Sequence, residues 1–333
     1  MASFIAAAAI SFSLLLWLRP LLARYALAKP NARSSHTEPT PQGGGIAVIA
    51  STIIVVAVVE VFFLRQSHEP LRLAVIFASA VGLAVVGAID DVRPLQAIPR
   101  LLLQIAAVAA VVAVLPHDMR IVAALPWWLD RTLALVGGVW FVNAVNFMDG
   151  IDWMTVAEIV PVTASLALFG LTGALPPDAT LVAVVLCGAA IGFAPFNRPV
   201  AKLFLGDVGS LPIGLLLGWM LLLLAGRGYP AAAALLPLYY LADATITLMR
   251  RLINGEPVTQ AHRSHFYQRA LDNGFSVYQI IGRVFVLNLI LAGLAAIAVF
   301  NDSAIVQMTM LAAGGILVGA LLKAFSHASR RQH

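Results

Sequence analysis

Apolar residues run along this chain in long blocks, and short polar connections separate the blocks. A transmembrane helix needs about 20 mostly apolar residues, with a usual range of roughly 17–25. We find about eleven such blocks and therefore expect an all-α, polytopic integral membrane protein with about eleven transmembrane helices. The candidate spans are residues 3–23, 44–64, 72–89, 100–115, 132–147, 154–173, 179–196, 208–225, 230–249, 277–300 and 304–324.

The basic residues of the connections predict how these spans are oriented. One set of connections, together with the C-terminal tail, holds fifteen Lys and Arg residues, and the opposite set holds five. Because cytoplasmic loops carry the excess of Lys and Arg, the richer side is predicted to be cytoplasmic. The N-terminus then lies outside and the C-terminus inside. We expect residues 1–325 to form a single transmembrane domain and residues 326–333 a short basic cytoplasmic tail.

The overall composition agrees with a chain embedded in lipid. Of the 333 residues, 61% are hydrophobic and 11% are charged, whereas about 25% of the residues of a soluble domain are charged. A single Cys excludes a disulfide scaffold. The net charge of +5 suggests contact with anionic lipid and phosphorylated substrates. The sequence contains no basic stripe interleaved with aromatic residues, so nothing in it indicates binding to nucleic acid.

The acidic residues on the predicted cytoplasmic side collect in three connections. Asp90 and Asp91 end the third span in the segment AIDDVRPLQAIPR. Adjacent carboxylates repel each other unless a cation or a metal compensates, and Arg93 and Arg100 are close enough in sequence to do so. The pair is either part of a functional site or an acidic pair bound to its own loop.

The second acidic connection reads NAVNFMDGIDW. Asn143, Asn146 and Asp149 recur every three residues and share a face if the helix continues. Gly150 permits a break, after which Asp152 returns near Asp149. Carboxylate and amide oxygens at this spacing suit a hard cation such as Mg²⁺. The alternative is a polar cap that ends the helix.

The third acidic connection, FLGDVGS, places Asp207 between two glycines at the start of a helix. Backbone N–H groups at a helix N-terminus attract anions. Asp207 is therefore either a helix cap, which is the commoner role of such an Asp, or a metal ligand beside a bound phosphate.

The longest cytoplasmic connection is basic and carries His262, Arg263 and His265. The lack of a third ligand makes a zinc site a poor interpretation of the two histidines. Mixed Arg and His side chains suit a phosphate or pyrophosphate group better. The alternative is a solvated basic loop that meets lipid headgroups.

The first cytoplasmic loop, KPNARSSHTEPTPQGGG, contains Gln42 and Gly43 in a segment without apolar residues. Its glycines allow a ligand to approach the backbone closely, or they only give the next helix a flexible entry. Within the ninth span, Asp243 is an intramembrane acid and hence a candidate functional residue. The alternative is a buried partner for Arg250 or Arg283.

Taken together, these sites place carboxylates, amides and cations on one membrane face. Carboxylates that bind Mg²⁺ and cations that bind phosphate are the two halves of a phosphoryl-transfer site. At the lipid–water boundary, such a site suits one water-soluble and one lipid substrate. A nucleotide diphosphate donor and a lipid phosphate acceptor satisfy both requirements.

The motifs DDVRPL, NFMDGID, FLGDVGS and HRSHFYQR, in this order between apolar spans, resemble the polyprenyl-phosphate N-acetylhexosamine-1-phosphate transferase family. RSSHTEPTP and HRSHFYQR are similar to its O-antigen and common-antigen initiator branch. The resemblance implies that a UDP-N-acetylhexosamine gives its sugar-1-phosphate to undecaprenyl phosphate and releases UMP. It also implies a bacterial inner membrane, a periplasmic N-terminus and an active site that faces the cytoplasm.

The resemblance further implies a role for individual residues. Asp90, Asp91 and Asp207 would be catalytic, the first two beside the acceptor phosphate, and Asp207 and Asn146 would hold Mg²⁺ or Mn²⁺. The residues expected to bind substrate are Gln42, Gly43, Arg93, Asn143, Asp149, Asp152, His262, Arg263 and His265. Two positions depart from the branch pattern, because Gln42 stands where a basic residue is expected and Trp153 where a glycine is expected.

A second hypothesis from another class is a proton-coupled lipid or solute transporter. Such a protein would use acids near the middle of the membrane on broken helices with internal repeats. No repeat is visible here, and Asp243 is the residue that suits this hypothesis. The sequence leaves open the sugar (GlcNAc, GalNAc, or a FucNAc or QuiNAc type), the oligomeric state, for which a homodimer is one option, and the polymer that is made.

Overall fold

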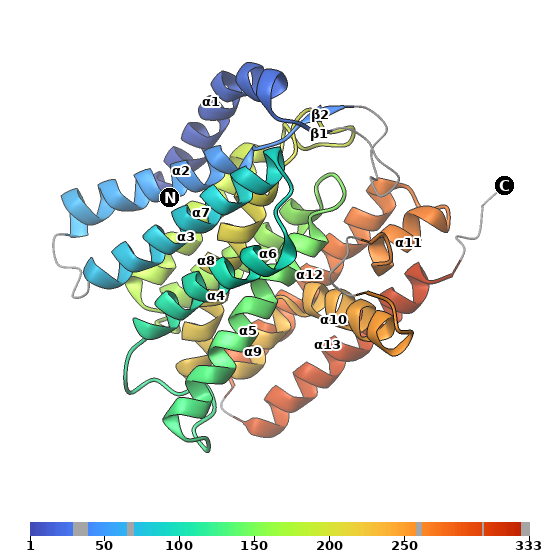
Figure 1. Cartoon of the computed structure of the whole chain (residues 1–333). Helices are drawn as coiled ribbons and strands as arrows, with labels where there is room; N and C mark the ends of the chain where they lie inside the picture. The colour runs from blue at the N-terminus through green and yellow to red at the C-terminus, as the bar shows by residue number, and fades with distance from the viewer. Residues whose placement is uncertain (29–38, 65–69, 258–261, 302, 328–333) are drawn as a thin grey trace.

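A computed structural model describes residues 1–28, 39–64, 70–257, 262–301 and 303–327 (Figure 1). These residues are almost entirely helical, which confirms the predicted all-α class. The helices are α1 (Ala2–Tyr25), α2 (Gly45–Val59) continued by a π-helical turn (Glu60–Leu64), α3 (Pro70–Val92), α4 (Ala97–Ala113), α5 (Trp127–Met148), α6 (Met154–Leu171), α7 (Pro177–Phe193), α8 (Asp207–Gly226), α9 (Pro230–Leu235), α10 (Leu238–Ile253), α11 (Phe266–Asp272), α12 (Val277–Val299) and α13 (Ala304–Phe325).

Every predicted span coincides with helical structure, but the number of membrane-crossing helices is not confirmed. Within the described residues, eight helices are long and apolar enough to cross a membrane, which is consistent with a polytopic membrane protein. The helices α4 and α7 are apolar but have only 17 residues each. The predicted span 230–249 is divided at Pro237 into α9 and α10, because proline has no N–H to continue a helix. The orientation of the termini stays a prediction, as does the single domain over residues 1–325, and most of the predicted tail lies outside the described residues.

The helix α8 lies at the centre of the bundle (Figure 1). It packs against α3 and α5 and also contacts α2, α4 and α9. Nearly all of its residues are buried, as expected for a helix that is apolar on every side. The polar end of this helix is Asp207, its first residue. The candidate metal ligand is therefore attached to the most enclosed element of the fold.

Two glycines bring neighbouring helices into backbone contact with the start of α8. A Cβ atom on Gly45 of α2 would overlap the Cα atom of Gly209, and a Cβ atom on Gly87 of α3 would overlap the carbonyl group of Asp207. Only glycine permits so close an approach of two backbones. The position of Asp207 is thus fixed by direct contact of α2 and α3 with α8.

A short strand pair flanks the first loop. Strand β1 (Leu27–Ala28) pairs antiparallel with β2 (Thr40–Pro41), with Leu27 opposite Pro41. After β2, the N–H of Gly44 donates to the carbonyl oxygen of Phe204 at 2.9 Å, which holds the glycines of this loop beside the segment that precedes Asp207. Residues 33–38 of the motif RSSHTEPTP lie outside the described residues.

Candidate active site

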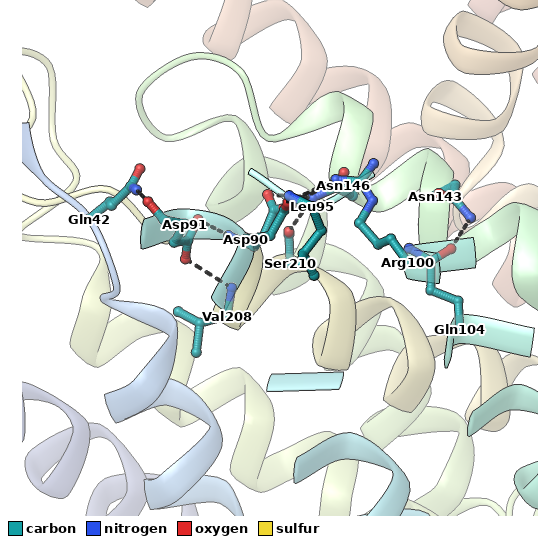
Figure 2. A network of polar contacts seen from close by, with 11 residues as sticks. Gln42, Asp90, Asp91, Leu95, Arg100, Gln104, Asn143, Asn146, Val208 and Ser210 are labelled. Atoms are coloured by element: carbon teal, nitrogen blue, oxygen red, sulfur yellow. Dashed lines mark hydrogen bonds and ion pairs between the residues drawn. The ribbon is translucent and has the colours of Figure 1, made fainter. Parts of the chain in front are cut away.

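The ends of α3, α4 and α8 meet at a cluster of two carboxylates and one guanidinium group (Figure 2). The Nη1 atom of Arg100 lies 2.6 Å from Oδ2 of Asp90 and 3.2 Å from Oδ2 of Asp207. The other oxygen of Asp90 accepts the backbone N–H of Leu95 at 2.5 Å. Arg100 therefore neutralises two acids that are far apart in sequence. The sequence had suggested it only as a partner for the acidic pair.

Asp91 has a different set of partners from Asp90. Its Oδ1 accepts the N–H of Asp207 at 2.9 Å, and its Oδ2 accepts the N–H of Val208 at 3.2 Å. These are orphan donors at the N-terminus of α8, so Asp91 caps that helix from a neighbouring one. Asp207 is the first residue of α8 rather than its cap. The side chain of Gln42 donates to the backbone carbonyl of Asp91 and joins the first loop to this cluster.

Of the two asparagines of α5, Asn146 contacts this cluster, and Asn143 contacts the neighbouring helix α4. The Nδ2 of Asn146 donates to Oδ1 of Asp207 at 2.8 Å and to Oγ of Ser210 at 2.9 Å. Neither bond uses the amide oxygen of Asn146. One turn earlier, Asn143 donates to the buried side chain of Gln104 at 2.7 Å. Ser210 and Gln104 were missed because a lone hydroxyl or amide in an apolar helix carries no local signal.

The two aspartates of the DGID segment have separate surroundings. Asp149 follows the end of α5 and accepts a hydrogen bond from Thr155. Burial raises the pKa of Asp149 to about 7, and the negative charges of Asp91 and Asp152 add to the rise. Oδ2 of Asp152 instead accepts the N–H of Ala201 at 2.9 Å. Asp149 is therefore electrostatically linked to the acid cluster, whereas Asp152 holds the segment before α8.

The basic loop is organised by Asp243, which is fully buried in α10. Its carboxylate lies 3.2 Å from Nδ1 of His265 and accepts the N–H groups of Phe266 at 3.0 Å and Tyr267 at 3.2 Å. Its other hydrogen bonds come from the hydroxyls of Tyr239 and Thr247 in α10, each at 3.3 Å. Among the described residues, the hydrogen bonds of this acid are thus with its own helix, the loop and the start of α11, and not with an arginine. The hydroxyl of Tyr267 donates to the carbonyl of Phe147 at 3.0 Å and ties the loop to the end of α5.

The remaining residues of this loop are partly buried. The rings of His262 and His265 are stacked with centroids 4.9 Å apart. Burial, together with the nearby His265 and two arginines, lowers the pKa of His262 to about 4, so this imidazole is neutral at pH 7. Nη2 of Arg263 lies 3.2 Å from Asp272. Arg93 is exposed in the segment after α3, and the roles predicted for these residues stay predictions.

The oxygen atoms at the centre of the site fit a hard divalent cation. The described residues contain no group of three His, Cys, Asp or Glu side chains arranged to hold a metal. Mg²⁺, however, is usually bound through one or two carboxylates, with waters and substrate phosphates completing its shell. A carboxylate oxygen of Asp207 and the amide oxygen of Asn146 are donors of the right kind.

Comparisons with known proteins agree with this arrangement of residues. Residues 72–225 match the model of the family described as "Glycosyl transferase family 4". The chain is 26% identical to the "Probable undecaprenyl-phosphate N-acetylglucosaminyl 1-phosphate transferase" of Bacillus subtilis, over 86% of this chain and 84% of the relative. It is 29% identical to the "Decaprenyl-phosphate N-acetylglucosaminephosphotransferase" of Mycolicibacterium smegmatis, over 88% of this chain and 80% of the relative.

A third relative, the "Phospho-N-acetylmuramoyl-pentapeptide-transferase" of Desulforamulus reducens, is 32% identical over 54% of this chain and 58% of the relative. The family model and these relatives support the polyprenyl-phosphate hexosamine-1-phosphate transferase family for this chain. The segment that matches the family model contains the whole acid cluster, from Asp90 to Asp207. Two loops lie outside that segment: the first loop, which contains Gln42 and Gly43, and the basic loop held by Asp243, which contains His262 and His265.

Proposed function

We propose that this protein transfers N-acetylglucosamine-1-phosphate from UDP-N-acetylglucosamine to undecaprenyl phosphate. An oxygen of the lipid phosphate bonds to the β-phosphorus of the donor, and the bond from that phosphorus to the bridging oxygen breaks. The products are undecaprenyl-diphospho-N-acetylglucosamine and UMP. The observation that carries the proposal is the cluster of Asp90, Arg100, Asn146 and Asp207, joined by contacts of 2.6–3.2 Å at the converging ends of four helices.

Within this proposal, Asp207 and Asn146 hold Mg²⁺, or Mn²⁺ in its place. The cation supplies charge neutralisation for the donor pyrophosphate. Asp90 lies beside the acceptor phosphate, where Arg100 offers a counter-charge. Asp91 acts through α8, because both of its carboxylate oxygens hold the amides that begin that helix.

The donor occupies the cytoplasmic face around the acid cluster. Gln42 and Gly43 line it from the first loop, and Asp149 and Asp152 line it from the segment after α5. Three features support this placement: the hydrogen bond of Gln42 to Asp91, the charge coupling of Asp149 with Asp91, and the tie of Tyr267 to Phe147. The pyrophosphate and sugar are held by His262, Arg263 and His265, with Arg93 and Asn143 at the periphery.

In the cell, we place the reaction on the cytoplasmic face of the bacterial inner membrane. It would be the membrane step that initiates O-antigen or a related cell-surface polysaccharide. The names of the relatives support a polyprenyl phosphate acceptor and an N-acetylglucosamine donor. The transporter hypothesis is not favoured, since the relatives are transferases and the carboxylate of Asp243 accepts the N–H groups of Phe266 and Tyr267.

The test is release of UMP by purified protein given undecaprenyl phosphate, Mg²⁺ and a panel of UDP-N-acetylhexosamines. Release should require lipid and metal together and should be fastest with UDP-N-acetylglucosamine. Asp207→Asn should abolish turnover in folded protein, whereas Asp118→Asn, at an exposed position, should not. Folded protein that releases no UMP with any donor would overturn the proposal, and full activity of Asp207→Asn would overturn the metal assignment.

A further inference from the structure

A cavity of about 630 Å³ is lined in large part by residues of the segment 194–202, which leads towards α8. Its volume is within the range of small-molecule sites, roughly 300–1,000 Å³. The walls come from the last turn of α7, from the segment 194–202 and from the residue before α6. They include Trp153, Ile191, Pro195, Arg198, Val200 and Lys202.

The lining of this cavity is apolar except for two cations. Arg198 and Lys202 contribute its charged side chains, and the lining contains no Asp, Glu, Asn or Gln. The cavity thus offers charge for an anion but no side-chain acceptor for the N–H and O–H groups of a nucleobase or a sugar. A lipid phosphate matches this chemistry better than a nucleotide does.

The rim of the cavity exposes apolar side chains. Val200 is 82% exposed and Ile191 is 40% exposed, and Ile191 ends one of the apolar helices of the bundle. We expect exposed aliphatic groups near the end of an apolar helix to favour lipid over water. The occupant is therefore expected to carry an apolar portion next to its anionic group.

Trp153 forms a fixed wall of the cavity in an unusual backbone conformation. Its φ of 59° lies in the left-handed region that favours glycine. Its backbone N–H donates to Asn197 at 2.8 Å, and its indole N–H donates to the carbonyl of Ala194 at 2.6 Å. Tyr278 packs edge-on against the indole and donates to the carbonyl of Pro199 at 2.9 Å. The strained residue is thus held by the segment that also carries both cations.

We propose that this cavity binds the headgroup of an anionic phospholipid, distinct from the lipid acceptor. The phosphate sits between Arg198 and Lys202, and the glycerol and upper acyl chain lie against Trp153 and Ile191. Because Asp152 accepts the N–H of Ala201, an occupant of the cavity contacts the same segment that positions the DGID loop. The proposal does not depend on the identity of the sugar donor.

Quenching of tryptophan fluorescence by brominated lipids tests this directly. The full-length protein is placed in phosphatidylcholine nanodiscs that contain either brominated phosphatidylglycerol or brominated phosphatidylcholine at equal mole fraction. The Trp153 component is the difference between the wild-type signal and that of Trp153→Phe. It should be quenched at least twofold more by phosphatidylglycerol.

The preference should vanish in the double variant Arg198→Gln with Lys202→Gln. The matched control is Arg19→Gln with Lys323→Gln, which removes two exposed cations at the ends of other helices and should keep the preference. Equal quenching by the two lipids in the wild-type protein would overturn the proposal without reference to any variant. Loss of the preference on addition of UDP would also overturn it, because the cavity would then bind the nucleotide.

Discussion

The cap that Asp91 places on α8 leads to a quantitative prediction. The two carboxylate oxygens of Asp91 accept backbone N–H groups at the start of α8, at 2.9 and 3.2 Å. Asp91→Asn removes the charge and leaves one oxygen for two donors. A capping side chain contributes about 0.5–2 kcal/mol, and the charge–dipole interaction adds about 0.3–1 kcal/mol or somewhat more when partly buried. Burial disfavours the charged form of Asp91, so the loss of its charge in Asp91→Asn offsets part of the lost capping. The free energy of unfolding should therefore fall by about 1–2 kcal/mol for Asp91→Ala and by less for Asp91→Asn.

The measurement is reversible unfolding in mixed micelles, with increasing SDS and tryptophan fluorescence as the signal. Asp118→Asn makes the same chemical change at an exposed position and should leave the unfolding curve unchanged within about 0.5 kcal/mol. UMP release should fall in the same order as stability, because Asp207 begins the helix that loses its cap.

One result would refute this reasoning. If Asp91→Ala unfolds with the wild-type curve but releases no UMP, the carboxylate acts on substrate and not through α8. The hydrogen bonds to the helix N-terminus would then contribute little to its position.

Three further predictions follow from single groups in the site. In the folded protein Asp149 keeps its proton up to about pH 7, whereas in the unfolded chain it loses the proton near pH 3.8. The stability that the protonated, buried form contributes is therefore full below about pH 4 and is lost as the pH rises through 7. Asp149→Asn should flatten this dependence of stability on pH in metal-free protein, and an unchanged dependence would contradict the pKa assigned to Asp149. Arg100→Met should lower the free energy of unfolding by about 1–3 kcal/mol without Mg²⁺, because Asp90 and Asp207 lose their shared counter-charge, and unchanged SDS unfolding would count against that role. Asp243→Asn should raise the donor KM and speed proteolysis between residues 254 and 265, whereas wild-type values for both would show that the loop does not need this anchor.

The sequence was sufficient to locate the helices, because a bilayer requires long apolar blocks and few other structures satisfy that requirement. The sequence predicted less well where individual helices end and whether the short ones cross the membrane. The ninth block is apolar throughout, yet Pro237 divides it into α9 and α10. The blocks that became α4 and α7 are near the lower limit of a spanning helix, so apolarity alone does not decide whether they cross.

The site was predictable where its geometry lies within one helix and not where it depends on packing. The three-residue spacing of Asn143 and Asn146 placed both on one face of α5, and both face neighbouring polar groups. The pairing of Arg100 with Asp90 follows from their closeness in sequence, whereas the contact of Arg100 with Asp207 and the partners of Asp91 depend on how α3 and α4 lie against α8, which no local pattern encodes. The same holds for Asp243, three of whose partners lie more than twenty residues later in the chain.

The backbone contacts at Gly45 and Gly87 also bear on how such an enzyme could change during evolution. Any side chain at either position would displace the first turn of α8 and with it Asp207, so the reacting centre has almost no room for variation. In the loop held by Asp243, the described glycine, Gly255, has no comparable backbone contact. New donor specificities should therefore arise, in nature or in the laboratory, by changes in that loop, and libraries that vary Gly45 or Gly87 should yield mainly inactive protein.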